Sequence, residues 1–192
     1  MNIYDPYPET IEFNGKTVRL DLSYDRVLRV IDAQSDGLLL PADRIRYQCE
    51  TLLRRPKNAP KSTKEQAELL KAIFDLFPKD ENPVKQTERY IDLHQDATMI
   101  RSAFFRIGID LQREKIHFFR FLELMKDLPA DTALMRTIEI RMKPVPKPDG
   151  HNQEQIAAIM KAKAAVAIKM SEEEQRERFA QSLKNSSLLT GR

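Results

Sequence analysis

The stretch from Asp96 to Leu128 constrains the fold most, because it places many apolar side chains at helical spacing around one short break. In its first half they recur at steps of three and four residues: Met99, Ile100, Ala103, Phe104 and Ile107. Gly108 can end a helix in the left-handed conformation, and the Asp110 carboxylate can accept from the free N–H groups that begin one. The pattern therefore predicts two helices joined by a corner at residues 108–110.

The second helix of this pair, expected to begin at Asp110, is apolar on more than one face. Its apolar residues are Ile116, Phe118, Phe119, Phe121, Leu122, Leu124, Met125 and Leu128. Such a helix is usually buried on several sides. We expect Phe105 and Phe119 to point away from the main core, where a partner or a second subunit would cover them.

The N-terminal part predicts a β-hairpin at about residues 10–20. Asn14-Gly15 is a strong hairpin signal, because both central residues of that turn need positive φ. Apolar residues alternate with polar ones on both sides: Ile11, Phe13, Val18 and Leu20. A lone hairpin is marginally stable in water, so we expect it to lie on the helices or to pair with a neighbouring subunit.

The remaining chain predicts a mainly α fold, since glycine is scarce, at 5 residues, and good helix formers abound. Ser23 is expected to cap a helix, and Ser62 has the spacing of a capping box with Glu65. The further predicted helices cover residues 23–34, 41–53, 62–77, 83–93, 132–142 and 153–170. A second capping-box match at Ser171 could break or restart the last of them.

The proline-rich segment 143–150 predicts the main boundary of the chain, because prolines so closely spaced cannot lie inside a helix. We therefore expect a body of residues 1–142, with the hairpin and the helices, a stiff linker of residues 143–150, and a helical extension of residues 151–192. The extension carries small residues and methionines, and it could bind a partner through Ile156, Ile159 and Met160. Equally, it could fold back on its own domain.

Charge and cysteine usage restrict the function classes. A net charge of +3 over 192 residues, with Lys and Arg scattered among Asp and Glu, makes nucleic-acid binding unlikely. Cys49 is the sole cysteine, so no intramolecular disulfide can form, which fits a reducing cytoplasm. We expect no signal peptide, because the N-terminus has no basic segment followed by an apolar one, and no membrane contact, because no apolar run approaches about 18 residues.

The ionisable residues predict no catalytic, metal or cofactor site. A metal site needs three or four converging ligands, and the histidines (His94, His117 and His151) form no such motif. We expect the His117 ring to pack beside the aromatic side chains while one ring nitrogen finds a partner, and Cys49 to act as a small buried hydrophobe. The chain is therefore not expected to be an enzyme. The basic loop 54–61 could contact phosphate, although such loops are more often solvated.

Several motifs resemble the bacteriophage gene product fifteen family of tailed phages and prophages. They are Gly108-Ile109-Asp110-Leu111, Ile116-His117-Phe118-Phe119-Arg120-Phe121, Leu128-Pro129, Asp131-Thr132 and Ile138-Glu139-Ile140-Arg141. The match is good over residues 96–141, collinear over the hairpin and the first helix, and loose elsewhere. The chain has Phe118 and Phe119 where the family often has tryptophan.

The resemblance implies a non-enzymatic, mostly helical tail assembly chaperone of the host bacterial cytoplasm. Proteins of that kind coat the long tape measure protein and help to recruit tail tube protein, so both are expected partners, together with self-association. The alternative is a nucleic-acid-binding phage morphogenesis or packaging factor, which the basic loop and the pI near 8.9 support.

Overall fold

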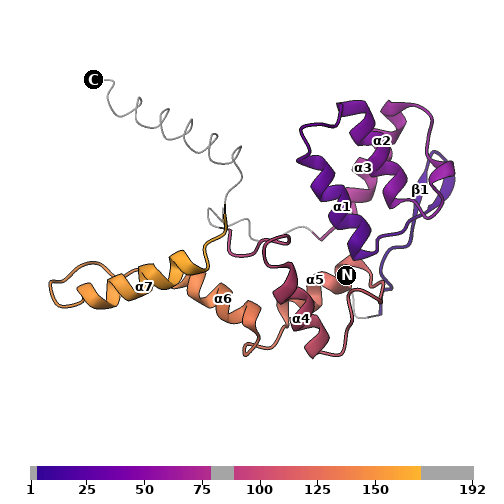
Figure 1. The fold of residues 1–192 in the computed structure, drawn as a ribbon. Coiled ribbons are helices and arrows are strands. Elements are labelled where there is room, and N and C mark those ends of the chain that lie inside the picture. The colour runs from indigo at the N-terminus through magenta and orange to yellow at the C-terminus, as the bar shows by residue number, and fades with distance from the viewer. Residues whose placement is uncertain (1–3, 79–88, 170–192) are drawn as a thin grey trace, which may run out of the picture. The chain divides into compact units, whose positions relative to one another are not determined.

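The computed structural model describes residues 4–78 and 89–169, in which seven α-helices follow one two-stranded hairpin (Figure 1). The fold is mainly α, as predicted. The chain divides into two compact units. Unit 1 comprises Met1–Val84 and Arg101–Leu128, and unit 2 comprises Lys85–Ile100 and Pro129–Arg192. No helix in the described ranges is both long and apolar enough to span a bilayer.

The predicted hairpin is present at the start of unit 1. Strands β1 (Thr10–Phe13) and β2 (Lys16–Arg19) pair antiparallel, with Ile11 opposite Val18. Asn14 and Gly15 have φ of 49° and 72°, the left-handed values that the Asn-Gly turn requires. The chain beyond β2 pairs with the end of α2, where Asp21 N donates to Leu52 O at 2.8 Å. The hairpin therefore lies on the helices of its own unit.

Three helices, with one short 3-10 turn, form the first layer of unit 1. They are α1 (Tyr24–Gln34), α2 (Pro41–Leu52), the 3-10 turn η1 (Pro56–Asn58) and α3 (Thr63–Asp75). Their apolar stripes meet in a core of Val27, Val30, Cys49, Leu52, Leu69 and Ile73, all fully buried. Ser23 and Ser62 occupy the expected N-cap positions, but neither side chain makes a cap hydrogen bond. Ser23 Oγ donates instead to Asp21 Oδ1 at 2.7 Å.

The Phe-rich pair differs from its prediction at the start of its second helix. Helix α4 (Ala97–Arg106) ends near Gly108, whose φ is 84°, as expected. Helix α5 (Phe118–Lys126) does not begin at Asp110. The Asp110 carbonyl and carboxylate close a turn at residues 110–114, and an extended segment follows.

That extended segment pairs with the chain just before α1, which explains why no helix forms there. Tyr24 N donates to Ile116 O at 3.0 Å, and Phe118 N donates to Leu22 O at 2.8 Å. A backbone group engaged in this ladder cannot also join a helix. Behind it, the Phe121 ring stacks between Phe104 and Tyr24, each at a centroid distance of 5.1 Å. These rings are the centre of the second layer of unit 1.

The first described residues of unit 2 are not helical, although the sequence predicted a helix over residues 83–93. The first residues of that predicted helix lie outside the described ranges, residues 89–92 are irregular, and residues 93–96 form a turn. The Asp92 carboxylate accepts from the N–H groups of His94 and Gln95, both at 2.8 Å. Aspartate side chains that bond nearby backbone groups compete with helix formation in this way.

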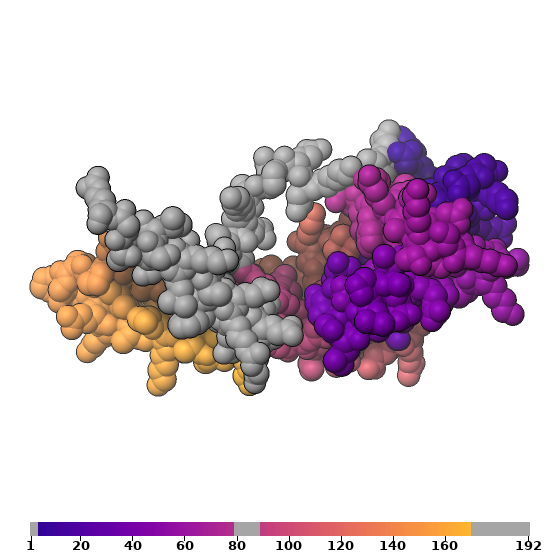
Figure 2. Space-filling model, turned by 90° about the horizontal axis from the view of Figure 1, so that it is seen from above, coloured from indigo at the N-terminus to yellow at the C-terminus, as the bar shows by residue number. Residues whose placement is uncertain are grey.

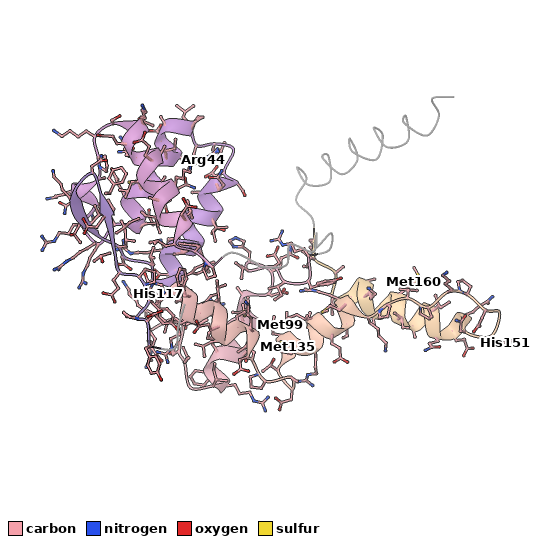
Figure 3. All side chains as sticks on the ribbon, turned by 180° about the vertical axis from the view of Figure 1, so that it is seen from behind. Arg44, Met99, His117, Met135, His151 and Met160 are labelled. Carbon is pink, nitrogen blue, oxygen red and sulfur yellow. The ribbon has the colours of Figure 1, made fainter. Side chains whose placement is uncertain are left out.

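The other helices of unit 2 are α6 (Ala133–Met142) and α7 (Gln153–Ala165). Thr132 Oγ1 caps α6 by accepting from Met135 N at 3.3 Å. Helix α6 lies against the start of α4, where Thr137 Oγ1 is 3.5 Å from Met99 Sδ (Figure 3). Helix α7 ends at Ala165, earlier than predicted, and the Ser171 motif lies outside the described residues.

Candidate partner-binding surfaces

A buried ion pair in unit 2 holds α6, α7 and the segment before α4 together. Arg141, on α6, forms a bidentate pair with Asp96, with Nη1–Oδ2 at 2.6 Å and Nη2–Oδ1 at 2.9 Å. Its Nη1 also donates to Tyr90 O at 2.8 Å, and its Nε donates to Val166 O at 2.7 Å. One guanidinium therefore joins α6 to the segment before α4 and to the end of α7.

Asp96 remains a carboxylate in this environment. Its side chain is 2% exposed and that of Arg141 is 9% exposed. Burial favours the neutral acid, but hydrogen bonds from Arg141 and from Asp92 N, with the Arg141 charge, outweigh it and lower the pKa of Asp96. A buried charge is stable only with such partners, so the position of α7 depends on this pair.

The sequence analysis missed this pair. Asp96 begins the Phe-rich stretch and Arg141 belongs to one of the family motifs, but nothing in the sequence links two residues 45 positions apart. Within residues 4–78 and 89–169, no cluster of His, Cys, Asp and Glu could hold a metal ion.

An apolar hollow opens between α6 and α7, within unit 2. It has a volume of about 200 Å³ and is lined by Ile140, Lys143, Ala158, Ile159 and Ala162. Lys163 Nζ donates to Lys143 O at 2.8 Å, beside the hollow. The small alanine side chains of α7 leave this space unfilled against the larger Ile140. For brevity we call it the alanine hollow.

The three predicted residues of α7 lie differently with respect to α6. Ile159 is buried, at 8% exposure, Ile156 is half-buried, and Met160 is 58% exposed (Figure 3). Thus α7 folds back against α6, one of the two alternatives considered for it. In the space-filling view, side chains of α7 project from the surface of unit 2 (Figure 2). A separate C-terminal domain beyond residue 150 stays a prediction.

Of the two phenylalanines predicted to point outward, only Phe105 does so. Phe105 is 70% exposed on α4, whereas Phe119 is 3% exposed. The prediction for Phe119 is wrong because Tyr7, from the N-terminal lead-in, and Phe77 cover its ring edge-on, at 6.3 and 5.5 Å. Phe119 is therefore a core residue of unit 1 and offers no surface to a partner.

His117 has the packing role that the sequence predicted for it. Its ring stacks on Tyr7 at 4.8 Å, and Nε2 is 3.3 Å from Pro8 O. It also caps α5, since Nδ1 accepts from Phe119 N at 3.2 Å. Burial lowers the pKa of His117, although the Pro8 carbonyl and the charges of Glu9 and Glu123 oppose that shift. The neutral ring, with a free lone pair on Nδ1, is the form that the cap requires.

The other candidates from the sequence are the Cys49 thiol and the basic loop 54–61. Burial raises the pKa of the Cys49 thiol to about 11, so it stays protonated as a small hydrophobe. In the basic loop, Arg54, Arg55 and Lys57 are exposed around the turn η1.

A second apolar surface, in unit 1, was also missed. Leu38 is 95% exposed and Leu40 is 69% exposed, in the loop between α1 and α2. The signal was present in the sequence as three consecutive leucines directly before Pro41. Loops are usually polar, so three leucines in a predicted loop indicate an exposed apolar surface.

Comparison with known proteins identifies the family. The family model described as bacteriophage Gp15 protein matches residues 3–168, most of the chain. Comparisons with curated proteins and with solved structures found no match. The matched range extends over parts of both units and includes the Arg141–Asp96 pair and the whole of α7. The chain therefore belongs to the bacteriophage Gp15 protein family.

Proposed function

We propose that this phage protein is a tail assembly chaperone that binds the tape measure protein, with tail tube protein as a further partner, in the bacterial cytoplasm. In this proposal it acts as a binding protein and not as an enzyme. Family membership supports the phage context. The observation that carries the binding role is Phe105, a large apolar side chain held 70% exposed on an ordered helix.

The surroundings of Phe105 fit the binding of an amphipathic helix. On α4 the inward face carries Ala103 and Phe104, which are buried, while Arg101 and Ser102 share the exposed face with Phe105. An aromatic anchor beside a cation suits a partner helix whose apolar stripe is flanked by acidic residues. Unit 2 has its own exposed apolar residue, Met160 on α7, a flexible side chain of the kind used at adaptable surfaces.

A tape measure protein is a long helical chain, and an apolar stripe along it would promote aggregation. A chaperone can cover such a stripe with many copies, each making a small contact. The affinity of each contact can be modest, because many sites on one chain are occupied together. This explains why one exposed aromatic residue on a rigid helix is a sufficient anchor.

Co-expression with the tape measure protein of the same phage tests the proposal. We expect the wild-type chain to keep that protein in the supernatant and to elute with it. Phe105→Asp should remove both effects, whereas Tyr47→Asp, at an exposed aromatic residue on α2, should keep them. If the wild-type chain changes neither the solubility nor the elution of the tape measure protein, the proposal is wrong.

A further inference from the structure

The connection between α2 and α3 concentrates positive charge that the net charge of +3 for the whole chain conceals. Between Glu50 and Glu65 the sequence has no carboxylate and five cations, all exposed: Arg54, Arg55, Lys57, Lys61 and Lys64. Arg19, exposed at the end of β2, lies beside them, because Arg54 N donates to Arg19 O at 3.1 Å. We call these six residues the basic patch.

The backbone that carries the basic patch is held in one conformation. Asn58 N donates to Arg55 O at 2.9 Å and closes the turn η1. The side chain of Gln66, buried on α3, donates through Nε2 to Pro60 O at 2.7 Å and ties the end of the loop to that helix. A loop that is already ordered loses little conformational entropy on binding. The cations are therefore presented on a preformed surface of unit 1.

No carboxylate neutralises the basic patch locally. The neighbouring parts of the hairpin, α2 and α3 carry carboxylates on both sides of the loop: Glu9, Glu12, Glu50, Glu65 and Glu68. In the part of the chain that the structure describes, none of them forms an ion pair with a cation of the patch. Glu12 instead accepts a hydrogen bond from Thr17 Oγ1, across the hairpin. The patch therefore retains its charge for an external anion.

The surroundings of the basic patch indicate which kind of anion fits it. Among the described residues, the large apolar side chains that are exposed include none from residues 9–20 or 53–64. An acidic peptide usually adds apolar anchors to its charges, and single-stranded nucleic acid adds bases that stack on aromatic side chains. Duplex DNA needs neither, because it presents one phosphate charge per about 1.7 Å and gains affinity from released counterions. A purely charged surface therefore fits a duplex best.

We propose that the basic patch binds the phosphate backbone of double-stranded DNA without sequence preference. The arginine and lysine side chains contact phosphate oxygens, and no base has to be read. The sequence analysis considered phosphate contact for the loop 54–61, but its expectation for the whole chain rested on the net charge, which averages over this local cluster. The inference does not depend on the proposed chaperone function, which uses Phe105 on α4.

Fluorescence anisotropy of a short labelled DNA duplex, titrated with the full chain at several salt concentrations, tests the proposal. For five or six phosphate contacts, the logarithm of the association constant should fall with the logarithm of the salt concentration with a slope of about −4 to −5. Arg54→Gln with Arg55→Gln and Lys57→Gln should weaken binding at low salt by about tenfold or more and reduce that slope by about 2–3. A second variant, Lys61→Gln with Lys64→Gln, leaves the turn intact and should reduce the slope by about 1–2.

Two controls separate the basic patch from net charge and from folding. Lys143→Gln with Lys147→Gln and Lys161→Gln removes the same charge from exposed positions of unit 2 and should bind the duplex as the wild type does. Arg54→Lys with Arg55→Lys keeps the charge of the patch and should keep the slope. A wild-type chain that does not bind the duplex at low salt, or patch variants that bind it no more weakly than the unit 2 variant, would overturn the proposal. Tighter binding of polyglutamate or of single-stranded DNA than of the duplex would also overturn it.

Discussion

The two units of this protein are stabilised in different ways. Among the described residues of unit 1, the large side chains with less than 2% exposure are apolar, and the Phe121 ring stacks between those of Phe104 and Tyr24. In unit 2, the described side chains with less than 2% exposure include Leu134 and also the Asp96 carboxylate. Unit 1 is held by apolar packing, and unit 2 depends on a polar network around one arginine.

This difference matters because the two kinds of core tolerate change differently. Loss of part of an apolar core leaves a cavity, and its cost grows with the volume lost. Loss of one member of a buried ion pair leaves an uncompensated charge, whatever its volume. Substitutions in each unit can therefore show whether lost volume determines the stability of unit 1 and lost charge pairing that of unit 2.

The largest effect is expected in unit 1, from Phe104→Ala. The Phe104 ring is fully buried and stacks on Phe121, so its removal should lower the free energy of unfolding of unit 1 by about 3–5 kcal/mol. Chemical denaturation monitored by circular dichroism measures this change. Phe105→Ala is the matched control. The Phe105 ring is 70% exposed, so its removal should change the free energy of unfolding by less than about 0.5 kcal/mol. Equal losses for the two variants would contradict the assigned core.

A somewhat smaller effect is expected in unit 2, from Arg141→Met. The substitution keeps an unbranched apolar stem but removes the guanidinium and leaves the Asp96 charge buried, which should cost about 3 kcal/mol. Amide hydrogen exchange should show lost protection in α6 and α7 and unchanged protection in α1 to α3. Arg136→Met, at an exposed position of the same helix, should leave both units unchanged.

A second substitution separates the lost charge pair from lost packing. Replacing both partners, as Asp96→Leu with Arg141→Met, removes the uncompensated charge and should recover much of the protection lost in the single variant. If the double variant is less stable than the single one, the Asp96 carboxylate stabilises unit 2 through the hydrogen bond from Asp92 N by more than its unpaired charge costs.

The sequence predicted those features that depend on neighbouring residues. The Asn14-Gly15 turn, the helix end near Gly108 and the apolar stripes of α1 to α3 follow from local spacing, and the structure confirms them. The start of α5 was wrong because residues 116–118 pair with residues 22–24, a contact that no local pattern encodes.

The candidate surfaces divide in the same way. Phe105 was predicted correctly to be exposed, because helical spacing alone determines its direction relative to Phe104. Phe119 was not, because Tyr7, distant in sequence, covers it. The Arg141–Asp96 pair and the alanine hollow depend on how distant segments pack together, so the sequence alone could not reveal them.

Helix capping gives a smaller contrast between the units. Thr132→Ala should destabilise unit 2 by about 1 kcal/mol, because its Oγ1 accepts from Met135 N at the start of α6. Ser62→Ala should have little effect on unit 1, since that side chain makes no cap hydrogen bond although it has the capping-box spacing. Thermal unfolding of the two single variants measures both. If Ser62→Ala lowers the stability more than Thr132→Ala does, the cap hydrogen bonds are assigned wrongly.

The smallest expected effect is a difference in the response of the two units to acid. The pKa of His117 is lowered in the folded state, so its neutral form stabilises unit 1 above the ordinary value of 6.5, and that contribution is lost as the pH falls through 6.5 toward the folded pKa. The pKa of Asp96 is also lowered, so its contribution to unit 2 is present above the ordinary value of 3.8 and is lost only in stronger acid.

Between about pH 7.5 and about pH 5.5, unit 1 should therefore lose stability through His117 while the Asp96–Arg141 pair stays intact. Hydrogen exchange at the two pH values, corrected for the intrinsic exchange rate, should show weaker protection at the start of α5 and unchanged protection between α6 and α7. His117→Asn is the matched control, because asparagine can cap α5 without titrating in this range. If that variant shows the same loss in α5, the acid response of unit 1 comes from another group, and the contrast between the two cores does not extend to pH.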